Sequence, residues 1–190
     1  MIEVVDSIVF YAQPAAENKS MISRNLNDAL NSQMNNEFYS AYCYLACTAY
    51  YQNEELNGFA NFFGIQAREE LEHGMKIFDY IHRVGGSSRL EPIASPKRDF
   101  KNILEPFQAG LDKERELAGE ISRLYQVAMA EHHAPTQVFL QWFVNEQVEE
   151  ESLFTHWVKR VQRILKDSNG ILRLDTELLE RVAETKDTPE

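Results

Sequence analysis

The chain of 190 residues is long enough for one domain with a sizeable hydrophobic core. Its formal net charge of −11 argues against nucleic acid and against an anionic membrane surface as partners. No apolar run approaches the ~18 residues that a membrane-spanning helix needs. The two cysteines, Cys43 and Cys47, stand four residues apart in a stretch expected to be helical. We interpret them as packing residues of a protein from a reducing, cytoplasmic compartment.

Residues 1–20 differ from the rest of the chain. A short β-prone stretch from Val4 to Phe10 is followed by Gln13-Pro14, and no helical periodicity is present. The segment also lacks the basic start of a secretory signal peptide. We therefore expect a poorly ordered extension of unknown role at 1–20, followed by a single domain over residues 21–190.

The first predicted helix begins near Met21. Apolar residues recur every three or four positions as far as Thr48, which predicts an amphipathic helix of roughly 28 residues. Glu37 falls on the stripe where apolar residues belong. A carboxylate at such a position faces the core.

The second predicted helix runs from about Leu56 to Val84, and Gly85-Gly86 marks its end. Glu70 and His73 lie on its apolar stripe, and residues three apart on a helix face the same way. A bare charge in the core is costly, so it must be neutralised, paired or bound to metal. Glu-x-x-His on a bundle helix is typical of di-iron carboxylate sites, although the motif alone is common.

A long connection follows at residues 86–100, where Pro92 and Pro96 interrupt any helical pattern. Because bundle helices usually join by short turns, this length predicts a crossover along the bundle. The third predicted helix runs from Lys101 or Asn102 to Ala130, or starts later, because a proline at 106 suits a first turn. Glu114 lies on its inner stripe.

The fourth predicted helix has Pro135 in its first turn and ends at Asn169-Gly170. It places Glu146, Gln147 and Glu150 near its inner face. A short final helix is expected over residues 176–182. The predicted fold is therefore all-α, a four-helix bundle with a long crossover between helices 2 and 3 and a short fifth helix at the C-terminus.

The two halves of the predicted bundle repeat the same spacing of polar residues. Glu37 precedes Glu70 by 33 residues, and Glu114 precedes Gln147 by 33 residues. Each of the four helices thus carries an acid on its apolar stripe. Any one of them could be an ordinary surface acid, as we expect for Glu72, Glu116 and Glu120. Four together would repel strongly unless divalent cations lay between them, and oxygen ligands with an imidazole suit iron or manganese.

The residues from Met21 to about Glu180 resemble non-haem bacterial ferritins. The matching stretches are Asn36-Glu37-Phe38-Tyr39-Ser40, Arg68-Glu69-Glu70-Leu71-Glu72-His73, Phe78-Asp79-Tyr80 and Phe139-Leu140-Gln141-Trp142-Phe143-Val144-Asn145-Glu146-Gln147-Val148-Glu149-Glu150-Glu151.

This resemblance implies a ferroxidase centre with ligands from all four helices. By position, the first iron binds Glu37, Glu70 and His73. Glu70 bridges to the second iron, which also binds Glu114 and Glu150. Together these five residues form the expected di-iron centre.

The resemblance also implies further residues around the pair. Gln147 is expected close to both irons. Glu69, Glu146 and Glu149 match a third, looser iron position on the path towards a storage cavity. The third position would therefore draw its ligands from the second and fourth helices.

Two aromatic residues and a difference from bacterioferritins also bear on the centre. Tyr44 and Trp142 match aromatic neighbours of the centre and could either supply an electron or simply pack the core. Bacterioferritins ligate haem through a methionine next to the bridging glutamate, and here that position is Leu71. We therefore expect no haem.

The function implied is iron storage with ferroxidase activity. Fe(II) would be oxidised by O2 or hydrogen peroxide and stored as a ferric mineral inside a shell of 24 identical subunits, with neither nucleic acid nor membrane as a partner. Two alternatives remain: a di-iron enzyme that oxidises an organic substrate, and a carrier bundle without redox activity. Aerobic Fe(II) oxidation and the mass of the assembly would separate the three.

Overall fold

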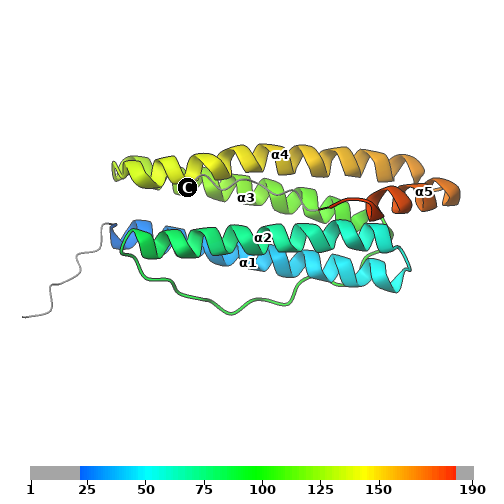
Figure 1. The fold of residues 1–190 in the computed structure, drawn as a ribbon, viewed down its shortest axis with the longest axis horizontal. Coiled ribbons are helices and arrows are strands. Elements are labelled where there is room, and N and C mark those ends of the chain that lie inside the picture. Colours follow the sequence, from blue (N-terminus) through cyan, green and yellow to red (C-terminus); the bar gives the residue numbers. More distant parts are fainter. Residues whose placement is uncertain (1–21, 183–190) are drawn as a thin grey trace, which may run out of the picture.

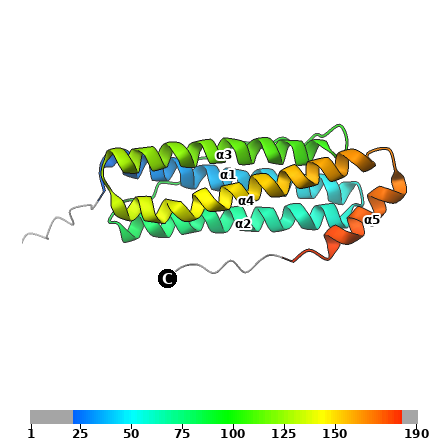
Figure 2. The same ribbon diagram turned by 90° about the horizontal axis from the view of Figure 1, so that it is seen from above.

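The computed structural model describes residues 22–182. Its helices are α1 (Arg24–Asn53), α2 (Asn57–Arg83), α3 (Glu105–Ala130), α4 (Ala134–Ile164) and the short α5 (Ser168–Leu179). Two antiparallel hairpins, α1–α2 and α3–α4, pack side by side, and α5 lies against one end of α2 (Figures 1 and 2). The prediction of a four-helix bundle with a short fifth helix is confirmed, whereas the proposed extension at 1–20 lies outside the described residues.

The connection between α2 and α3 runs along the length of the first hairpin, as the crossover prediction requires (Figure 1). Three asparagines, one helical turn apart on α1, hold alternate residues of this connection through its backbone. At 2.5 to 3.2 Å, Asn27 bonds Ser87, Asn31 bonds Ser87 and Arg89, and Asn35 bonds Arg89 and Glu91. Each side-chain amide both donates to a carbonyl and accepts from an N–H group, as a neighbouring β-strand would.

Three helix boundaries can be compared with the sequence predictions. The hydroxyl of Ser23 accepts a hydrogen bond from the N–H of Leu26 and so caps the start of α1. Gly85, with φ 71°, ends α2, as the glycine pair predicted. The start of α3 is the later of the two considered, with Pro106 in its first turn.

The predicted end of the fourth helix was wrong. α4 ends at Ile164, and Asn169-Gly170 lies in the first turn of α5 rather than after a helix. The final helix likewise begins earlier than the predicted residues 176–182. Its start is set by tertiary packing, because Leu174 and Leu178 are buried in the core cluster beside α2.

Residues of α5 complete the N-terminus of α2. Leu56 offers no side-chain cap, and Oδ1 of Asp175 instead accepts hydrogen bonds from the N–H groups of Gly58 (2.7 Å) and Phe59 (3.0 Å). A Cβ atom at position 58 would lie 1.7 Å from the carbonyl oxygen of Asp175. Only a glycine therefore permits α5 to approach this closely.

The core is divided into two apolar clusters with a polar layer between them. On α1, residues 26–34 belong to one cluster and residues 44–51 to the other, and Glu37 lies between. The same division occurs on α2, α3 and α4, and in each case buried acids occupy the gap. The fold thus places the acids of four helices at one level of the bundle.

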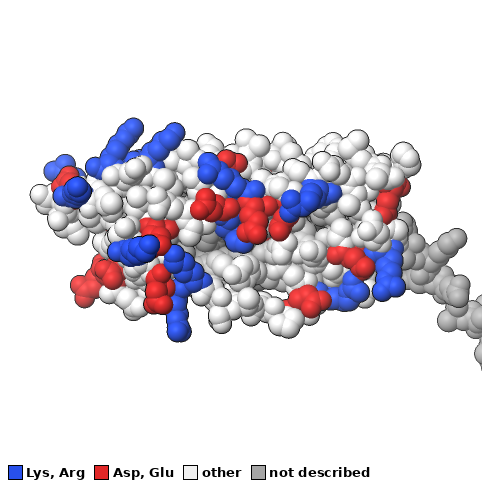
Figure 3. Space-filling view, turned by 180° about the vertical axis from the view of Figure 1, so that it is seen from behind, with Lys and Arg blue, Asp and Glu red and all other residues white. Residues whose placement is uncertain are grey.

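Unlike the buried layer, which is acidic, the surface carries charges of both signs close together. Figure 3 shows acidic and basic side chains in mixed groups on that face of the molecule. On α3, for example, Lys113 pairs with Glu116 at 2.5 Å, and Arg123 lies 3.9 Å from Glu120. Within residues 22–182, no helix is long and apolar enough to cross a membrane.

Candidate metal centre

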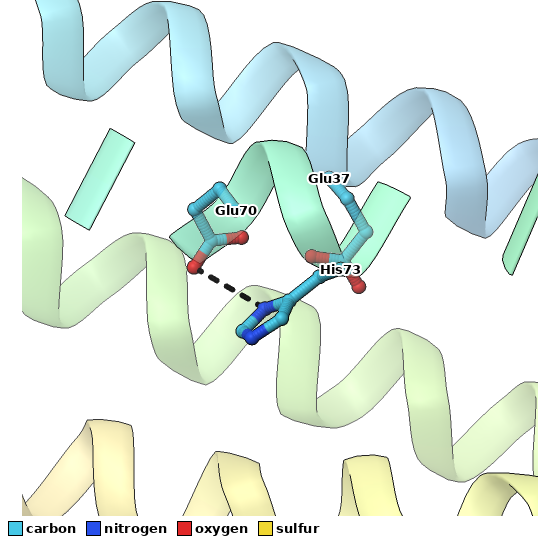
Figure 4. A group of neighbouring side chains, drawn as sticks. All are labelled: Glu37, Glu70 and His73. Atoms are coloured by element: carbon cyan, nitrogen blue, oxygen red, sulfur yellow. Dashed lines mark ion pairs between the residues drawn. The ribbon is translucent and has the colours of Figure 1, made fainter. Parts of the chain in front are cut away.

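The first group of potential ligands comes from α1 and α2. One ligand atom each of Glu37, Glu70 and His73 can be chosen so that all lie within 4.8 Å of one another, and all three residues are buried. Figure 4 shows the three side chains converging from neighbouring helices, with Oε1 of Glu70 3.8 Å from Nδ1 of His73. Two carboxylates and an imidazole at this spacing can hold one metal ion.

The second group comes from α3 and α4. Glu114 and Glu150 are 0% and 2% exposed, so neither carboxylate is solvated. Both act electrostatically on Glu70, which places all three carboxylates in one charged cluster. Glu70 therefore stands between the two groups, where one carboxylate can serve two cations.

Amide and phenol groups hold the carboxylates in place. Nε2 of Gln147 donates to Oε2 of Glu114 at 2.5 Å and to its backbone oxygen at 3.0 Å. The hydroxyl of Tyr44 donates to Oε1 of the same carboxylate. Both oxygens of Glu114 are thus oriented before any ligand enters. Gln147 and Tyr44, expected near the centre, do contact one of its acids.

Two further amides, which the sequence analysis did not single out, orient the other acids. Nε2 of Gln33 donates to Oε1 of Glu37 at 2.8 Å, and Nε2 of Gln66 donates to Oε2 of Glu150 at 3.0 Å. Both glutamines are buried, at 2% and 0% exposure. The signal was available, because an amide on an apolar stripe needs a buried partner. Glutamines therefore belong to the site as orienting groups.

The electrostatics follow from burial. Desolvation raises the pKa of Glu37 and raises that of Glu114 to about 7, although hydrogen bonds from neutral donors partly oppose the shift. The pKa of Glu70 is raised well above its usual range, first by burial and then by the charges of Glu114 and Glu37. Without cations, some of these groups hold protons; cations can replace those protons.

The donor set fits iron. Oε2 of Glu70 is buried and has no hydrogen-bond partner within the described residues, an arrangement that a bound cation would satisfy. Carboxylate oxygens with one imidazole are ligands that suit iron and manganese. The same pattern, an acid from each helix with Glu-x-x-His, is typical of di-iron bundles.

The residues expected at a third position are not all alike. Glu69 and Glu146 are buried, at 7% and 5% exposure, and Oε1 of Glu146 lies 3.9 Å from Nε2 of His73. Glu149 is exposed. The third set therefore spans the boundary between the buried centre and the surface. Glu120, expected on the surface, is instead partly buried and accepts a hydrogen bond from Asn36 at 2.7 Å.

The two aromatic neighbours differ in their surroundings. The buried phenol of Tyr44 contacts the acid cluster directly and stacks on Phe154 with ring centroids 5.5 Å apart. Trp142 packs edge-on against His73 at 5.3 Å, and Nζ of Lys76 lies 3.5 Å from its ring centroid. A cation over an indole ring is stabilising for the neutral ring but opposes loss of an electron from it.

Comparison with known proteins agrees with this arrangement. Residues 27–164 match the family model of the ferritin-like domain. The chain is 42% identical over 158 residues to a bacterial non-heme ferritin of Staphylococcus aureus, which covers 83% of this chain and 95% of the relative. A bacterial non-heme ferritin of Staphylococcus haemolyticus is 41% identical, covering 85% of this chain and 97% of the relative.

Solved structures give the same result. An open-pore ferritin from the hyperthermophilic archaeon Archaeoglobus fulgidus superposes with a TM-score of 0.84 at 37% identity, covering 86% of this chain and 99% of that one. A humanized archaeal ferritin gives a TM-score of 0.83 at 38% identity, covering 85% and 99%. The resemblance to non-haem bacterial ferritins is thereby confirmed, and the chain belongs to the ferritin family.

Proposed function

We propose that this protein oxidises Fe(II) at a di-iron ferroxidase centre and stores the ferric product. The observation that carries the proposal is the layer of buried carboxylates contributed by four helices around His73. The family supports iron as the cargo, since its relatives are named as bacterial non-heme ferritins. Uncompensated acids in a core are so costly that metal binding is their best explanation.

In this proposal each carboxylate has a defined role. Glu37 and His73 bind the first iron, Glu114 and Glu150 bind the second, and Glu70 bridges the two. The amides that bond Glu37, Glu114 and Glu150 fix the orientation of these ligands. Glu70 has an oxygen without such a donor, which supports its role as the bridge. Ligands held in advance reduce the cost of metal binding.

The oxidation step needs an electron balance. Two Fe(II) ions each give one electron, so together they reduce O2 to the level of hydrogen peroxide with uptake of two protons. Reduction of the peroxide to two waters takes two more electrons and two more protons. We propose that Tyr44 supplies one of these electrons and a third Fe(II) ion the other, because the phenolic proton of Tyr44 can pass to the Glu114 carboxylate that it already contacts. Lys76 makes Trp142 the poorer donor, since its positive charge opposes oxidation of the indole.

Storage requires a closed assembly, which we propose to be the shell of 24 subunits. An apolar groove of about 720 Å³ on the α1–α2 face supports association with a second copy. It is lined by half-exposed apolar side chains that a monomer would leave in water, namely Tyr42, Leu45, Leu71 and Met75. Glu69, Glu146 and Glu149 would then receive iron on its way to the cavity.

Anaerobic Fe(II) titration of the apoprotein, followed by addition of O2, tests the proposal. We expect two tightly bound Fe(II) ions per subunit, rapid oxidation of both, and particles of 24 chains with a mass of about 530 kDa from 22.0 kDa subunits. Binding without oxidation would identify a carrier, and a small oligomer would remove the storage function. Hydrogen peroxide in place of O2 would determine the preferred oxidant.

A further inference from the structure

Arg181 follows α5 and lies against α2 beside the metal centre. Its guanidinium carbon is 4.5 Å from the ring centroid of Phe62, and its Nη2 atom is 3.7 Å from Oε2 of Glu69. Asn61 fixes the backbone at this point, because its Nδ2 donates to the carbonyl of Arg181 at 2.9 Å. The positively charged side chain is therefore held over one particular carboxylate.

The surroundings of this ion pair are largely dry. The side chains of Arg181 and Glu69 are 20% and 9% exposed. Nη1 of Arg181 is buried and makes no hydrogen bond within residues 22–182. Because a guanidinium keeps its proton at neutral pH, the charge is permanent, and its effect on Glu69 is only weakly screened by solvent.

The geometry of the pair leaves room for exchange. At 3.7 Å the contact is longer than a hydrogen bond, whereas Arg160 binds Glu177 through two bonds of 2.5 and 2.6 Å. A metal ion bound by Glu69 would share this carboxylate with the guanidinium and repel it. The two cations therefore compete for the same group.

We propose that Arg181 is a built-in counter-cation of Glu69 that a metal ion has to displace, so that the segment after α5 sets the metal affinity of the third position. This inference rests on the proposed function, because it assumes that Glu69 receives iron. The arginine acts on the third position and leaves the pair bound by Glu70 and His73 unaffected. The alternative is that Arg181 orients Glu69 for metal binding. In that case, removing the arginine would weaken metal binding at the third position instead of strengthening it.

The test measures metal binding rather than turnover. Zn²⁺, which has no redox chemistry, is titrated calorimetrically into the assembled apoprotein as wild type, Arg181→Gln and Arg181→Met. Methionine keeps an aliphatic chain over Phe62 and so covers the case in which the glutamine variant fails to assemble. We expect both neutral variants to bind the third Zn²⁺ roughly three- to tenfold more tightly at low salt, with the first two sites unchanged. The difference should shrink at high salt.

Two further variants test whether Arg181 acts through Glu69 and whether the loss of any arginine ion pair would have the same effect. Glu69→Gln should abolish binding of the third Zn²⁺. When Arg181→Gln is added to this variant, Zn²⁺ binding should not change further. Arg160→Gln, which removes the surface ion pair between α4 and Glu177 of α5, is the matched control and should leave all sites unchanged.

Unchanged or weaker third-site binding in both neutral variants would overturn the role of Arg181 while leaving the di-iron centre intact. Retention of the third Zn²⁺ in Glu69→Gln would overturn the third position itself, and this inference with it.

Discussion

At the scale of single residues, the centre is organised by hydrogen bonds as well as by charge. Three acids accept hydrogen bonds from buried glutamine amides, and the fourth, Glu70, shares its surroundings with Glu37 and His73. Buried amide donors hold a carboxylate without adding a positive charge that would compete with metal. The protein therefore orients most of its proposed ligands while leaving the cluster in need of cations.

Removing a proposed ligand should slow iron oxidation without affecting assembly. For His73→Ala or Glu70→Ala we expect the initial rate of Fe(II) oxidation to fall roughly tenfold or more, since loss even of a group that supports a ligand weakens metal sites by 10- to 100-fold. Both residues are buried inside one bundle, so the size of the assembly should not change. Stopped-flow absorbance and light scattering measure the two quantities. Wild-type kinetics in an assembled variant would contradict the ligand assignment.

The acid cluster should make the apoprotein less stable as pH rises. Glu114 has a pKa of about 7 in the fold against an ordinary value of 4.5, so the folded state retains a proton that the unfolded chain has released. Stability is therefore highest below pH 4.5 as far as this group is concerned and declines up to about pH 7. Glu114→Gln should reduce this decline and stabilise the apoprotein at neutral pH by about 1 kcal/mol.

Thermal melts of metal-free protein between pH 5 and 8 test this expectation. A gain of 1 kcal/mol corresponds to about 2–4 °C in melting temperature for a chain of this size. Glu116→Gln, an exposed acid on the same helix, is the control. Added metal should stabilise the wild type more than Glu114→Gln, because binding to the folded state alone raises stability. A variant that melts lower and responds fully to metal would show that Glu114 is no ligand.

Sequence patterns identified the buried acids but only some of the groups that hold them. Glu37, Glu70 and Glu114 stood out because a charge on an apolar stripe is anomalous. Gln33 and Gln66 lie on the same stripes, yet a neutral amide is a weaker anomaly, and its partner on another helix depends on how the helices pack. Arg181 gave no signal at all, because its contact with Glu69 depends on the path of the chain after α5.

At the scale of secondary-structure elements, α5 and α2 depend on each other. The carboxylate of Asp175 caps α2, which carries both Glu70 and His73, and Asn61 on α2 binds the carbonyl of Leu178 in return. Sequence periodicity predicted the long helices well, because each buries a continuous stripe. It misplaced α5, whose start is decided by docking on another helix.

Substitution of Asp175 tests this dependence. Asp175→Ala removes the cap from two N–H groups and should lower the stability of the protein by about 1 kcal/mol. Asp175→Asn is the matched control, because an asparagine side chain caps helices equally well. Chemical denaturation measures the stability, and limited proteolysis of the C-terminal region reports whether α5 has detached. Equal losses in both variants would mean that charge rather than capping is responsible.

At the scale of the whole molecule, the described bundle of residues 22–182 contains every residue of the proposed centre. Deletion of residues 2–20 should therefore leave folding, shell assembly and Fe(II) oxidation intact. Size-exclusion chromatography with light scattering and the oxidation assay provide the measurement, with the full-length protein as reference. Failure of the shortened chain to form shells would show that the N-terminal segment takes part in subunit contacts.

Asn27, Asn31 and Asn35 form a ladder of hydrogen bonds between α1 and the crossover, two structures that differ in rise per residue. Four helical residues advance about 6.0 Å, whereas two extended residues advance about 6.6 Å, so each successive rung drifts by about 0.6 Å. Three rungs keep this drift within the range of a hydrogen bond, and the next position on α1 is Tyr39 instead of a fourth asparagine. The accumulating offset therefore limits how many successive asparagines of α1 can bond the crossover. Insertions should be tolerated in the crossover beyond residue 91, but a single insertion within residues 87–91 would put the remaining rungs out of register.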